Sequence, residues 1–402
     1  MILALTLMVR DEADVIAAML EHHLAQGVDR IVVTDNGSVD GTREILEDYA
    51  RVAPITLLHD PEHRKQQGAV VTRMARAAAV EHGADWVING DADEFLRPVD
   101  PSTTLRDVFA ALPASVGSFR VPVVNLVGPL ARHGSGIRRL VHRDLRTDEQ
   151  LLAAGLVAHP TPNAIHVGSP DVEVAQGNHR VSIPESGEVP DGLALEVLHL
   201  PWRSMDQIER KTRNMGEGYD ASPDLHPSPR HHGMRDWRRM RAGLLLPFVA
   251  CRMPVPAELD DAASFREDRS LAASLEALDA LLPERLAASL DDSGDQPYDA
   301  EAVLAEREKA RLVEPLERIV LEELTNARLD ADALRTDRDS LGVQLEGTRG
   351  HAERIERELA AARDEAEALR ARLERHEASR AHRAAMLARR TLGLGHRDGT
   401  GA

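Results

Sequence analysis

Three acidic residues stand within four positions of the segment WVINGDADEF, which runs from Trp86 to Phe95. Asp91, Asp93 and Glu94 follow an apolar run that is typical of a buried β-strand. Carboxylates placed so close together repel one another, so water, a metal ion or a cationic neighbour must offset their charge. The motif therefore predicts a site at which negative charge is offset by one of these three.

A second polar cluster lies in VVTDNGSVDGT, which starts at Val32. Asp35 and Asn36 stand at the end of a predicted strand, where a carboxylate and an amide can hydrogen-bond the edge of a planar base. One alternative is a plain turn in which Ser38 or Asp40 caps the next helix. The other is a calcium-binding EF-hand loop, whose ligand positions match five residues: Asn36, Ser38, Asp40, Gly41 and Glu47. An EF-hand loop is entered from a helix, however, whereas this segment follows a strand, so we expect a ligand-facing turn.

Strands and helices alternate around these clusters. Apolar runs predict strands at 2–9, 30–35, 54–60 and 86–90, and the segments between them have helical periodicity, with Gly27 and Gly83 as helix stops. This alternation predicts an α/β fold with a parallel sheet covered by helices. Both polar clusters fall at the carboxyl ends of strands, where such sheets bind ligands.

The rest of the chain divides by composition. We predict that residues 1–250 form one domain, 251–300 a helical connector, 301–380 a helical, coiled-coil extension and 381–402 a basic, disordered tail. Two heptad series support the coiled coil and a possible homo-oligomer: Leu334, Leu341, Ile355, Ala362 and Leu369 at position a, and Leu345, Ala352, Leu359, Ala366 and Leu373 at position d. Gly342, Gly347 and Gly350 leave open whether the extension is one rod or two helices with a hinge.

Composition excludes some classes of protein. The formal net charge of −18 argues against general affinity for nucleic acid. The single cysteine, Cys251, excludes an internal disulfide and favours a reducing compartment. The N-terminal apolar run is too short for a membrane span, and no transmembrane segment is expected. We expect a cytoplasmic protein, peripheral at the inner face of the membrane if it meets a membrane at all.

The order of the motifs resembles a known family. LMVRDEADVI, VTDNGSVDGT and INGDADEF are similar to the ordered motifs of family 2-like glycosyltransferases with the GT-A fold, a Rossmann-like, mostly parallel sheet between helices. LHLPWRSMDQIERKTRN, from Leu198 to Asn214, resembles the signature of a bacterial subgroup with a His-x-Pro-aromatic-Arg-Ser run. The resemblance covers roughly residues 1–245. It implies an NDP-sugar donor, Mn²⁺ or Mg²⁺ on the Asp-x-Asp motif, inversion at the anomeric carbon and a role in polysaccharide biosynthesis.

The resemblance also suggests roles for individual residues. Asp93 is expected to bind the metal and Asp91 the ribose or a metal-bound water, while Glu94 points outward or lies behind them. His199 is the expected third metal ligand and His179 its rival. Expected contacts to the sugar nucleotide are Thr6, Arg10, Asp35, Asn36, Arg64, Arg73 and Arg203. The general base is open among Glu173, Glu196, Glu217 and Asp236, with Glu217 and Asp236 preferred. Asn36 stands where many members carry a second Asp, which leaves the base of the nucleotide open.

The sequence thus predicts a glycosyltransferase that acts on a glycan, lipid-linked or cell-surface acceptor. A nucleotidyltransferase of similar fold is one alternative, but it predicts a Gly-rich phosphate loop after the first strand, where MVRDEAD is acidic and has no glycine. An inactive sugar-nucleotide-binding scaffold with a coiled-coil recruitment arm is the other. The intact pair Asp91 and Asp93 argues against that scaffold.

Overall fold

The structure, a computed structural model, describes residues 1–62, 66–222, 225, 227–281, 286, 289–291 and 295–392. The chain divides into two compact units, Met1–Thr325 and Asn326–Ala402. The first unit contains both polar clusters, so it holds the candidate site.

A six-stranded sheet forms the centre of the first unit. Its strand order is β3-β2-β1-β4-β9-β6. The strands are β1 (Leu3–Val9), β2 (Arg30–Asp35), β3 (Ile55–His59), β4 (Trp86–Asn89), β6 (Ser118–Val121) and β9 (Asn163–Val167). β1 to β4 run parallel, whereas β9 is antiparallel to both of its neighbours. The parallel ends of β1, β2 and β4 therefore meet at one edge, which confirms the predicted mostly parallel sheet of a GT-A-like α/β fold.

Helices α1 (Ile16–Ala25), α2 (Thr42–Val52) and α3 (Gln67–Val80) connect these strands, as the sequence pattern predicts. α3 packs against β1, β2 and β4 and buries Val70, Val71 and Met74 there. Gly27 and Gly83 have φ angles of 88° and 65° just beyond α1 and α3. This left-handed conformation ends a helix and favours glycine, so both glycines stop their helices as expected.

A second, five-stranded sheet has the order β11-β8-β7-β10-β5. Its strands are β5 (Glu94–Pro98), β7 (Val123–Val127), β8 (His142–Asp144), β10 (Leu195–His199) and β11 (Phe265–Glu267). β10 pairs antiparallel with β5, so His199 stands opposite Glu94. This register brings the HLPWRS segment beside the acidic motif, although about a hundred residues separate them in sequence.

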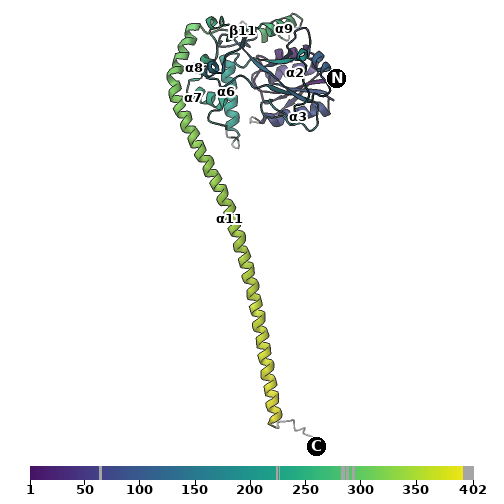
Figure 1. The fold of residues 1–402 in the computed structure, drawn as a ribbon, viewed down its shortest axis with the longest axis vertical. Helices are drawn as coiled ribbons and strands as arrows, with labels where there is room; N and C mark the ends of the chain where they lie inside the picture. The colour runs from purple at the N-terminus through teal and green to yellow at the C-terminus, as the bar shows by residue number, and fades with distance from the viewer. Residues whose placement is uncertain are drawn as a thin grey trace. The chain divides into compact units, whose positions relative to one another are not determined.

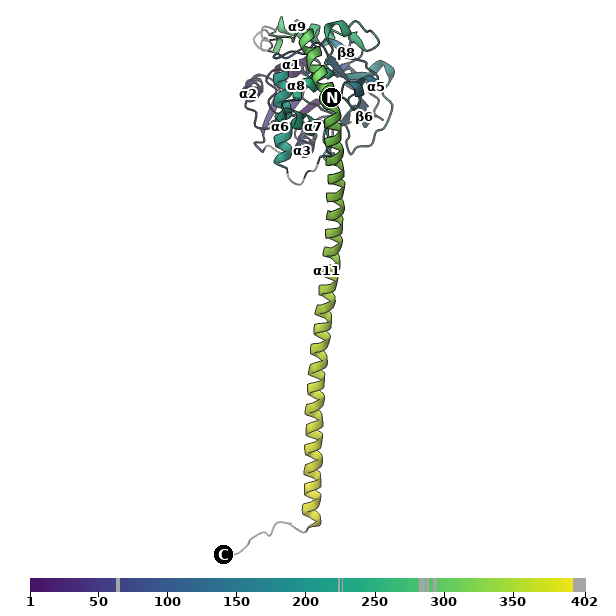
Figure 2. The same cartoon turned by 90° about the vertical axis from the view of Figure 1, so that its left-hand side faces the viewer.

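Three helices follow β10 and lie side by side in both views (Figures 1 and 2): α6 (Met205–Asp220), α7 (His232–Arg241) and α8 (Leu245–Arg252). Ser204 caps α6, because its side chain accepts a hydrogen bond from the backbone N–H of Gln207. Further helices of the first unit are α4 (Leu105–Ala111), α5 (Asp148–Ala153), α9 (Ser270–Asp279) and the 3₁₀ turns η1 (Asp191–Leu193) and η2 (Pro256–Glu258). Among the described residues, no helix is both long enough and apolar enough to cross a membrane.

Residues 251–300, expected to be a connector, are partly built into the first unit. β11 pairs with β8, and α9 packs against α1. The long helix α11 (Ala300–Thr391) begins in this unit and buries Val303 and Ala310. α11 is continuous through Gly342, Gly347 and Gly350. The extension is therefore one helix, without the hinge that the sequence left as an alternative. The compact unit therefore continues to Thr325, well past residue 250.

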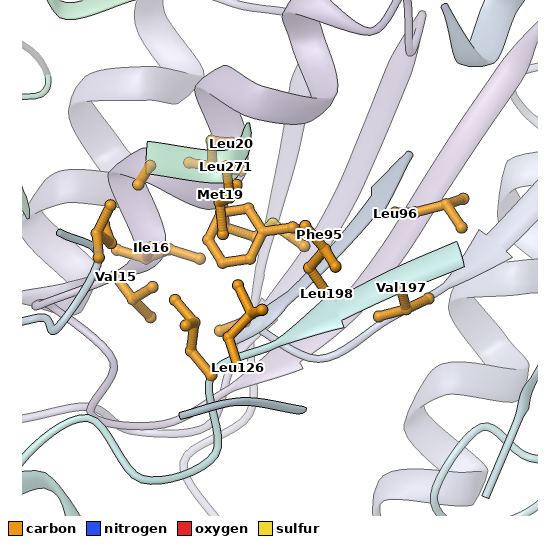
Figure 3. Packing of buried hydrophobic residues seen from close by; sticks show 14 of the residues in the cluster. Val15, Ile16, Met19, Leu20, Phe95, Leu96, Leu126, Val197, Leu198 and Leu271 are labelled. Carbon is orange, nitrogen blue, oxygen red and sulfur yellow. The ribbon is translucent and has the colours of Figure 1, made fainter. Parts of the chain in front are cut away.

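Apolar packing fixes the position of the acidic motif from behind. Phe95, which directly follows Glu94, is fully buried and lies among Met19, Leu126 and Leu198 (Figure 3). The next residue, Leu96, is held by two buried histidines of α1. His22 Nε2 lies 2.8 Å from the Leu96 carbonyl oxygen, and the Leu96 N–H donates to His23 Nε2 over 3.3 Å. The start of β5 is thus anchored on both sides of its backbone.

Candidate active site

A pocket of about 190 Å³ opens at the edge where β1, β2 and β4 end. Residues just beyond these three strands line it, together with the start of α3 and one face of α6. The polar residues among them include Arg10, Glu12, Asn36, Asp91, Asp93 and Lys211. The two polar clusters that the sequence placed at strand ends therefore contribute to one pocket.

Asp93 is the most strongly paired carboxylate of the pocket. It is 2% exposed, and its Oδ2 lies 2.6 Å from Lys211 Nζ, 3.5 Å from Arg203 Nη1 and 3.6 Å from His199 Nε2. Burial alone would raise the pKa of Asp93, but Lys211, His199 and Arg203 hold that pKa well below its usual range. Asp93 is therefore ionised and meets positive charge on several sides.

Asp91 has a different environment. Its Oδ1 accepts hydrogen bonds from Gln67 Nε2 at 2.9 Å and from Asn178 Nδ2 at 3.2 Å, both of them neutral donors. Burial, followed by the charge of Asp93, raises the pKa of Asp91 above its usual value. The negative charge of Asp91 is thus less well offset than that of Asp93, and a further cation in the pocket would stabilise it.

Glu94 lies behind the pair instead of pointing outward. Its Oε2 accepts hydrogen bonds from Asn163 Nδ2 at 2.7 Å and from the Asp91 N–H at 3.2 Å. Burial and the neighbouring charges of Asp91 and Asp93 raise the pKa of Glu94 well above its usual value. Of the two placements expected for Glu94, the structure selects the one behind Asp91 and Asp93.

Arg203 does not reach the pocket. It is fully buried, and its Nε donates to Asp14 Oδ2 at 2.8 Å, while its Nη2 donates to Glu12 and its Nη1 faces Asp93. Carboxylates of the chain already surround the guanidinium. Contrary to the prediction from the sequence, the structure therefore does not place Arg203 where it could contact a diphosphate in the pocket. Arg203 instead joins the acidic loop after β1 to Asp93.

Asp11 is a positioning residue that the sequence did not single out. Its φ angle is 57°, unusual for a residue other than glycine. Its Oδ1 accepts from the Val39 N–H at 2.8 Å, and its Oδ2 accepts from Asn214 Nδ2 at 2.8 Å. Asp11 thus ties the ends of β1 and β2 to α6, the helix that carries Lys211.

Lys211 is the main functional residue that sequence reasoning missed. It stands in the quoted segment LHLPWRSMDQIERKTRN, but its distance from the acidic motif in sequence hides the pairing. Burial would lower the pKa of Lys211, yet Asp93 and Glu12 raise it overall, so the amine is charged. The residue lines the pocket and brings a fixed positive charge into it.

The expected contacts to the nucleotide base are only partly brought together. Arg10 and Asn36 line the pocket, and Arg10 Nη1 donates to the Asn36 carbonyl oxygen. The Asn36 side-chain nitrogen, however, donates to the carbonyl oxygens of Asp60 at 2.9 Å and Glu62 at 2.8 Å. Asn36 therefore holds the segment after β3, and its amide nitrogen is not free for a base.

Three more of the expected contacts lie outside the pocket. Asp35 is fully buried and accepts from the Ser38 N–H at 3.0 Å, so it stabilises the turn after β2. Thr6 is also fully buried and donates to Asn89 Oδ1 at 2.8 Å, between β1 and β4. Arg73 is 69% exposed on α3. Arg64 lies outside the described residues.

The expected three-ligand metal site is not assembled. Among the described residues, no three His, Cys, Asp or Glu side chains are grouped so that they could hold a metal ion. The calcium-loop alternative at residues 36–47 loses support for another reason, because this segment directly follows the strand β2 and not a helix. His199 Nδ1 lies 2.9 Å from Asn125 Oδ1, and His179 Nδ1 lies 3.2 Å from Asn163 Oδ1. Asp91 and Asp93 remain as the candidate metal-binding pair, with His199 Nε2 on the side of Asp93.

Comparison with known proteins decides between the enzyme classes. Residues 7–140 match the model of the family described as glycosyl transferase family 2. Residues 7–140 are thus similar to a family 2 glycosyltransferase domain. The matched segment includes Arg10, Asn36, Asp91 and Asp93, whereas His199 and Lys211 follow it. The resemblance of the three ordered motifs is thus confirmed, and the nucleotidyltransferase alternative gains no support.

Solved structures similar to this chain include residues 1–349 of S. aureus TarS in complex with UDP-GlcNAc. That match has 13% identity and a TM-score of 0.35, and covers 81% of this chain and 89% of that chain. Another is glucosyl-3-phosphoglycerate synthase from Mycobacterium tuberculosis with Mn²⁺, UDP and glucosyl-3-phosphoglycerate, at 18% identity and a TM-score of 0.24. It covers 41% of this chain and 56% of that chain. No curated protein matches the chain.

None of the candidate general bases lines the pocket at the end of the sheet. Glu217 is exposed on α6. Asp236 is buried in α7 and accepts from both terminal nitrogens of Arg252, at 2.7 and 2.5 Å. Glu196 accepts hydrogen bonds from both terminal nitrogens of Arg143, and Glu173 is an exposed residue near Arg76. The structure therefore supports no catalytic role for Glu217 or Asp236, because it places one on the surface and the other in a buried ion pair.

Proposed function

We propose that this chain transfers a sugar from an NDP-sugar to a glycan, lipid-linked or cell-surface acceptor, with inversion at the anomeric carbon. The observation that carries the proposal is the position of Asp91 and Asp93. They lie next to each other in a pocket at the carboxyl end of the sheet, within the segment that matches the glycosyltransferase family. A diphosphate is the part of such a donor that these groups can hold, through a shared cation.

Mn²⁺ or Mg²⁺ is the proposed cofactor, held by Asp93 and Asp91. The donor set fits such an ion, because a hard cation takes oxygen ligands and binds through one or two carboxylates together with phosphate oxygens. The raised pKa of Asp91, caused by burial and by Asp93, indicates negative charge that a dication would stabilise. When bound, the metal would act as a Lewis acid toward the negative charge of the leaving diphosphate.

The residues of the chain perform the remaining tasks. Lys211 brings its ammonium into the pocket from α6, and Arg10 brings its guanidinium from the end of β1. Fixed positive groups of this kind stabilise a diphosphate whose charge grows as the bond to the sugar breaks. Arg203, Asp11 and Glu94 hold these groups in place from outside the pocket, so the site is largely formed before a ligand binds.

Thermal unfolding of the purified protein with UDP-, GDP- and dTDP-sugars, each with Mn²⁺ or with a chelator, tests the proposal. A ligand that binds the folded state stabilises it by RT ln(1 + [L]/Kd), about 2.7 kcal/mol at one hundred times the Kd. We expect one family of NDP-sugars to raise the Tm with Mn²⁺ and not with the chelator, and to be hydrolysed slowly. A shift with nucleoside triphosphates alone would favour the nucleotidyltransferase, and binding without any turnover would favour the inactive scaffold.

A further inference from the structure

The second unit presents one apolar face that no other described residue of the chain covers. Along α11, the buried residues are Val303 and Ala310, and both belong to the first unit. Six large apolar side chains follow one another along one face beyond Asn326, with exposed fractions from 49% for Ile355 to 63% for Leu341. They are Leu341, Leu345, Ile355, Leu359, Leu369 and Leu373. A helix that exposes such a stripe gains stability when the stripe is covered.

The spacing of this stripe is that of a coiled-coil seam. Leu341 and Leu345 are four residues apart, and the same step recurs from Ile355 to Leu359 and from Leu369 to Leu373. A step of four leads from position d to the next position a. The first leucine or isoleucine of each pair is therefore at position d and the second at position a, the reverse of the assignment made from the sequence. The seam from 341 to 373 spans about five heptads, more than the three or four that indicate a coiled coil.

The glycines do not interrupt the seam. With Leu345 at position a, Gly342 falls at position e, Gly347 at c and Gly350 at f. None of them is at a core position a or d, and α11 is continuous through all three. Small residues do occur within the seam, where Ala352, Ala362 and Ala366 allow the helices to approach closely.

The flanking charges indicate which partner covers the seam. In two parallel helices in register, position g of one chain faces position e of the following heptad in the other, five residues further along. This rule pairs Glu358 with the partner's Arg363, Glu365 with the partner's Arg370, and Arg372 with the partner's Glu377. All three pairs have opposite charges, and symmetry makes each of them twice.

A shift of one heptad destroys this pattern. It places Glu365 opposite the partner's Glu377 and, on the other side of the seam, Glu358 opposite the partner's Glu356. Arg372 then faces the partner's Arg370 as well. Two attractive contacts remain, Glu358 with Arg370 and Glu365 with Arg363, against three repulsive ones. We infer that α11 binds a second copy of this chain and forms a parallel, in-register, two-stranded coiled coil over residues 341–377.

Charge reversal at position g tests this pairing in the full-length protein. Light scattering of the wild type should give twice the mass of one chain. The variant Glu358→Arg/Glu365→Arg/Arg372→Glu turns all three of these g–e′ contacts into like charges and should raise the dimer Kd at least tenfold. The variant Arg363→Glu/Arg370→Glu/Glu377→Arg should do the same, and an equal mixture of the two should restore the dimer as a heterodimer.

A matched control uses the outward position f. Arg357→Glu/Asp364→Arg reverses two charges of the same helix that do not flank the seam, and the dimer Kd should not change. Orientation is measured with Leu345→Cys, near one end of the seam, in a Cys251→Ser background, where mild oxidation should link two parallel chains through residue 345. A monomeric or tetrameric wild type, a dimer that survives reversal at g, or failure of the 345 disulfide in a stable dimer would overturn the inference, the last because it indicates antiparallel chains.

Discussion

Lys211 Nζ lies 2.6 Å from Asp93 Oδ2, although the two residues are 118 positions apart in sequence. The pair connects the helix α6 to the acidic motif that ends β4. It gives the pocket a permanent cation next to the carboxylates that are proposed to bind a metal. In the proposed site, Lys211 and a divalent metal would share one carboxylate, and the two cations would be coupled electrostatically.

Replacing Lys211 by Met tests two expected effects of its amine: competition with a metal for Asp93 and attraction of a diphosphate. Without the ammonium, Asp93 loses the largest of the influences that lower its pKa, and a competitor for the carboxylate is gone. We expect Mn²⁺ alone to bind more tightly, while the affinity for an NDP-sugar falls about tenfold or more, because the diphosphate loses a cationic partner. Titration calorimetry with Mn²⁺ and with the donor measures both. Lys211→Arg keeps the charge and serves as control, and unchanged affinities in Lys211→Met would contradict the shared-carboxylate account.

Arg203→Met should destabilise the fold instead of acting on the ligand alone. Its removal leaves Glu12, Asp14 and Asp93 without their common counter-ion, and breaking a buried ion pair costs about 3–5 kcal/mol. Urea unfolding should show a loss of that order. Arg73→Met, an exposed control on α3, should change the free energy of unfolding by less than about 0.5 kcal/mol. A stable Arg203→Met protein that binds the donor poorly would restore the diphosphate contact expected from the sequence.

Some features of the fold and of the candidate site could be predicted from the sequence, and others could not. The order of strands and helices up to Asn89 was predictable, because local periodicity and the stops at Gly27 and Gly83 encode it. The placement of Asp91 and Asp93 in a pocket followed from the general rule for parallel sheets. The partners of Arg203 did not follow, since 191 and 189 positions separate it from Glu12 and Asp14. The sequence alone does not distinguish an arginine in a buried ion cluster from an arginine that binds a phosphate.

The same limit explains the unsupported general bases. Asp236 looks available in sequence, but α7 and α8 bring Arg239 and Arg252 to within 3.1 and 2.5 Å of it. Burial alone would raise the pKa of Asp236, and the arginines lower it overall, so it stays ionised as half of an ion pair. Only the packing of those helices, which periodicity does not determine, distinguishes such a residue from a catalytic carboxylate.

The stability of the first unit should decrease as the pH falls below about 6.5. Burial lowers the pKa of His22 to about 4 and that of His23 to about 3. In the unfolded chain both protonate near pH 6.5, so at lower pH the unfolded state binds more protons and becomes favoured. Each histidine contributes up to about 1.4 kcal/mol per pH unit between pH 6 and 4. Urea unfolding at several pH values should give a shallower slope for His22→Gln, whose amide can still donate to the Leu96 carbonyl. Equal slopes would contradict the buried, neutral state.

Truncation should place the end of the first unit at Thr325. A chain of residues 1–325 keeps the start of α11, where Arg307 donates to the carbonyl oxygens of Ala250 at 2.9 Å and Met253 at 2.7 Å. It also keeps the ion pair between Glu317 and Arg239, at 2.6 Å. We expect its Tm to match that of the full chain, whereas residues 1–297 should unfold at least about 5 °C lower. Equal Tm values for both truncations would place the boundary before α11.

The exchange Asp91→Asn tests the central claim most directly. Asp91 is a better position than Asp93, because Asp93 also pairs with Arg203 and Lys211 and its loss would disturb the fold. An asparagine oxygen can still accept from Gln67 and Asn178, and the loss of charge relieves repulsion by Asp93, so the Tm should stay equal or rise.

The measurement is a Mn²⁺ titration of NDP-sugar hydrolysis by wild type, Asp91→Asn and the control Asp48→Asn, which changes an exposed residue of α2. The account predicts that Asp91→Asn lowers metal-dependent turnover at least about tenfold in a fully folded protein, while Asp48→Asn behaves as wild type. Turnover and Mn²⁺ dependence equal to wild type in Asp91→Asn would contradict it.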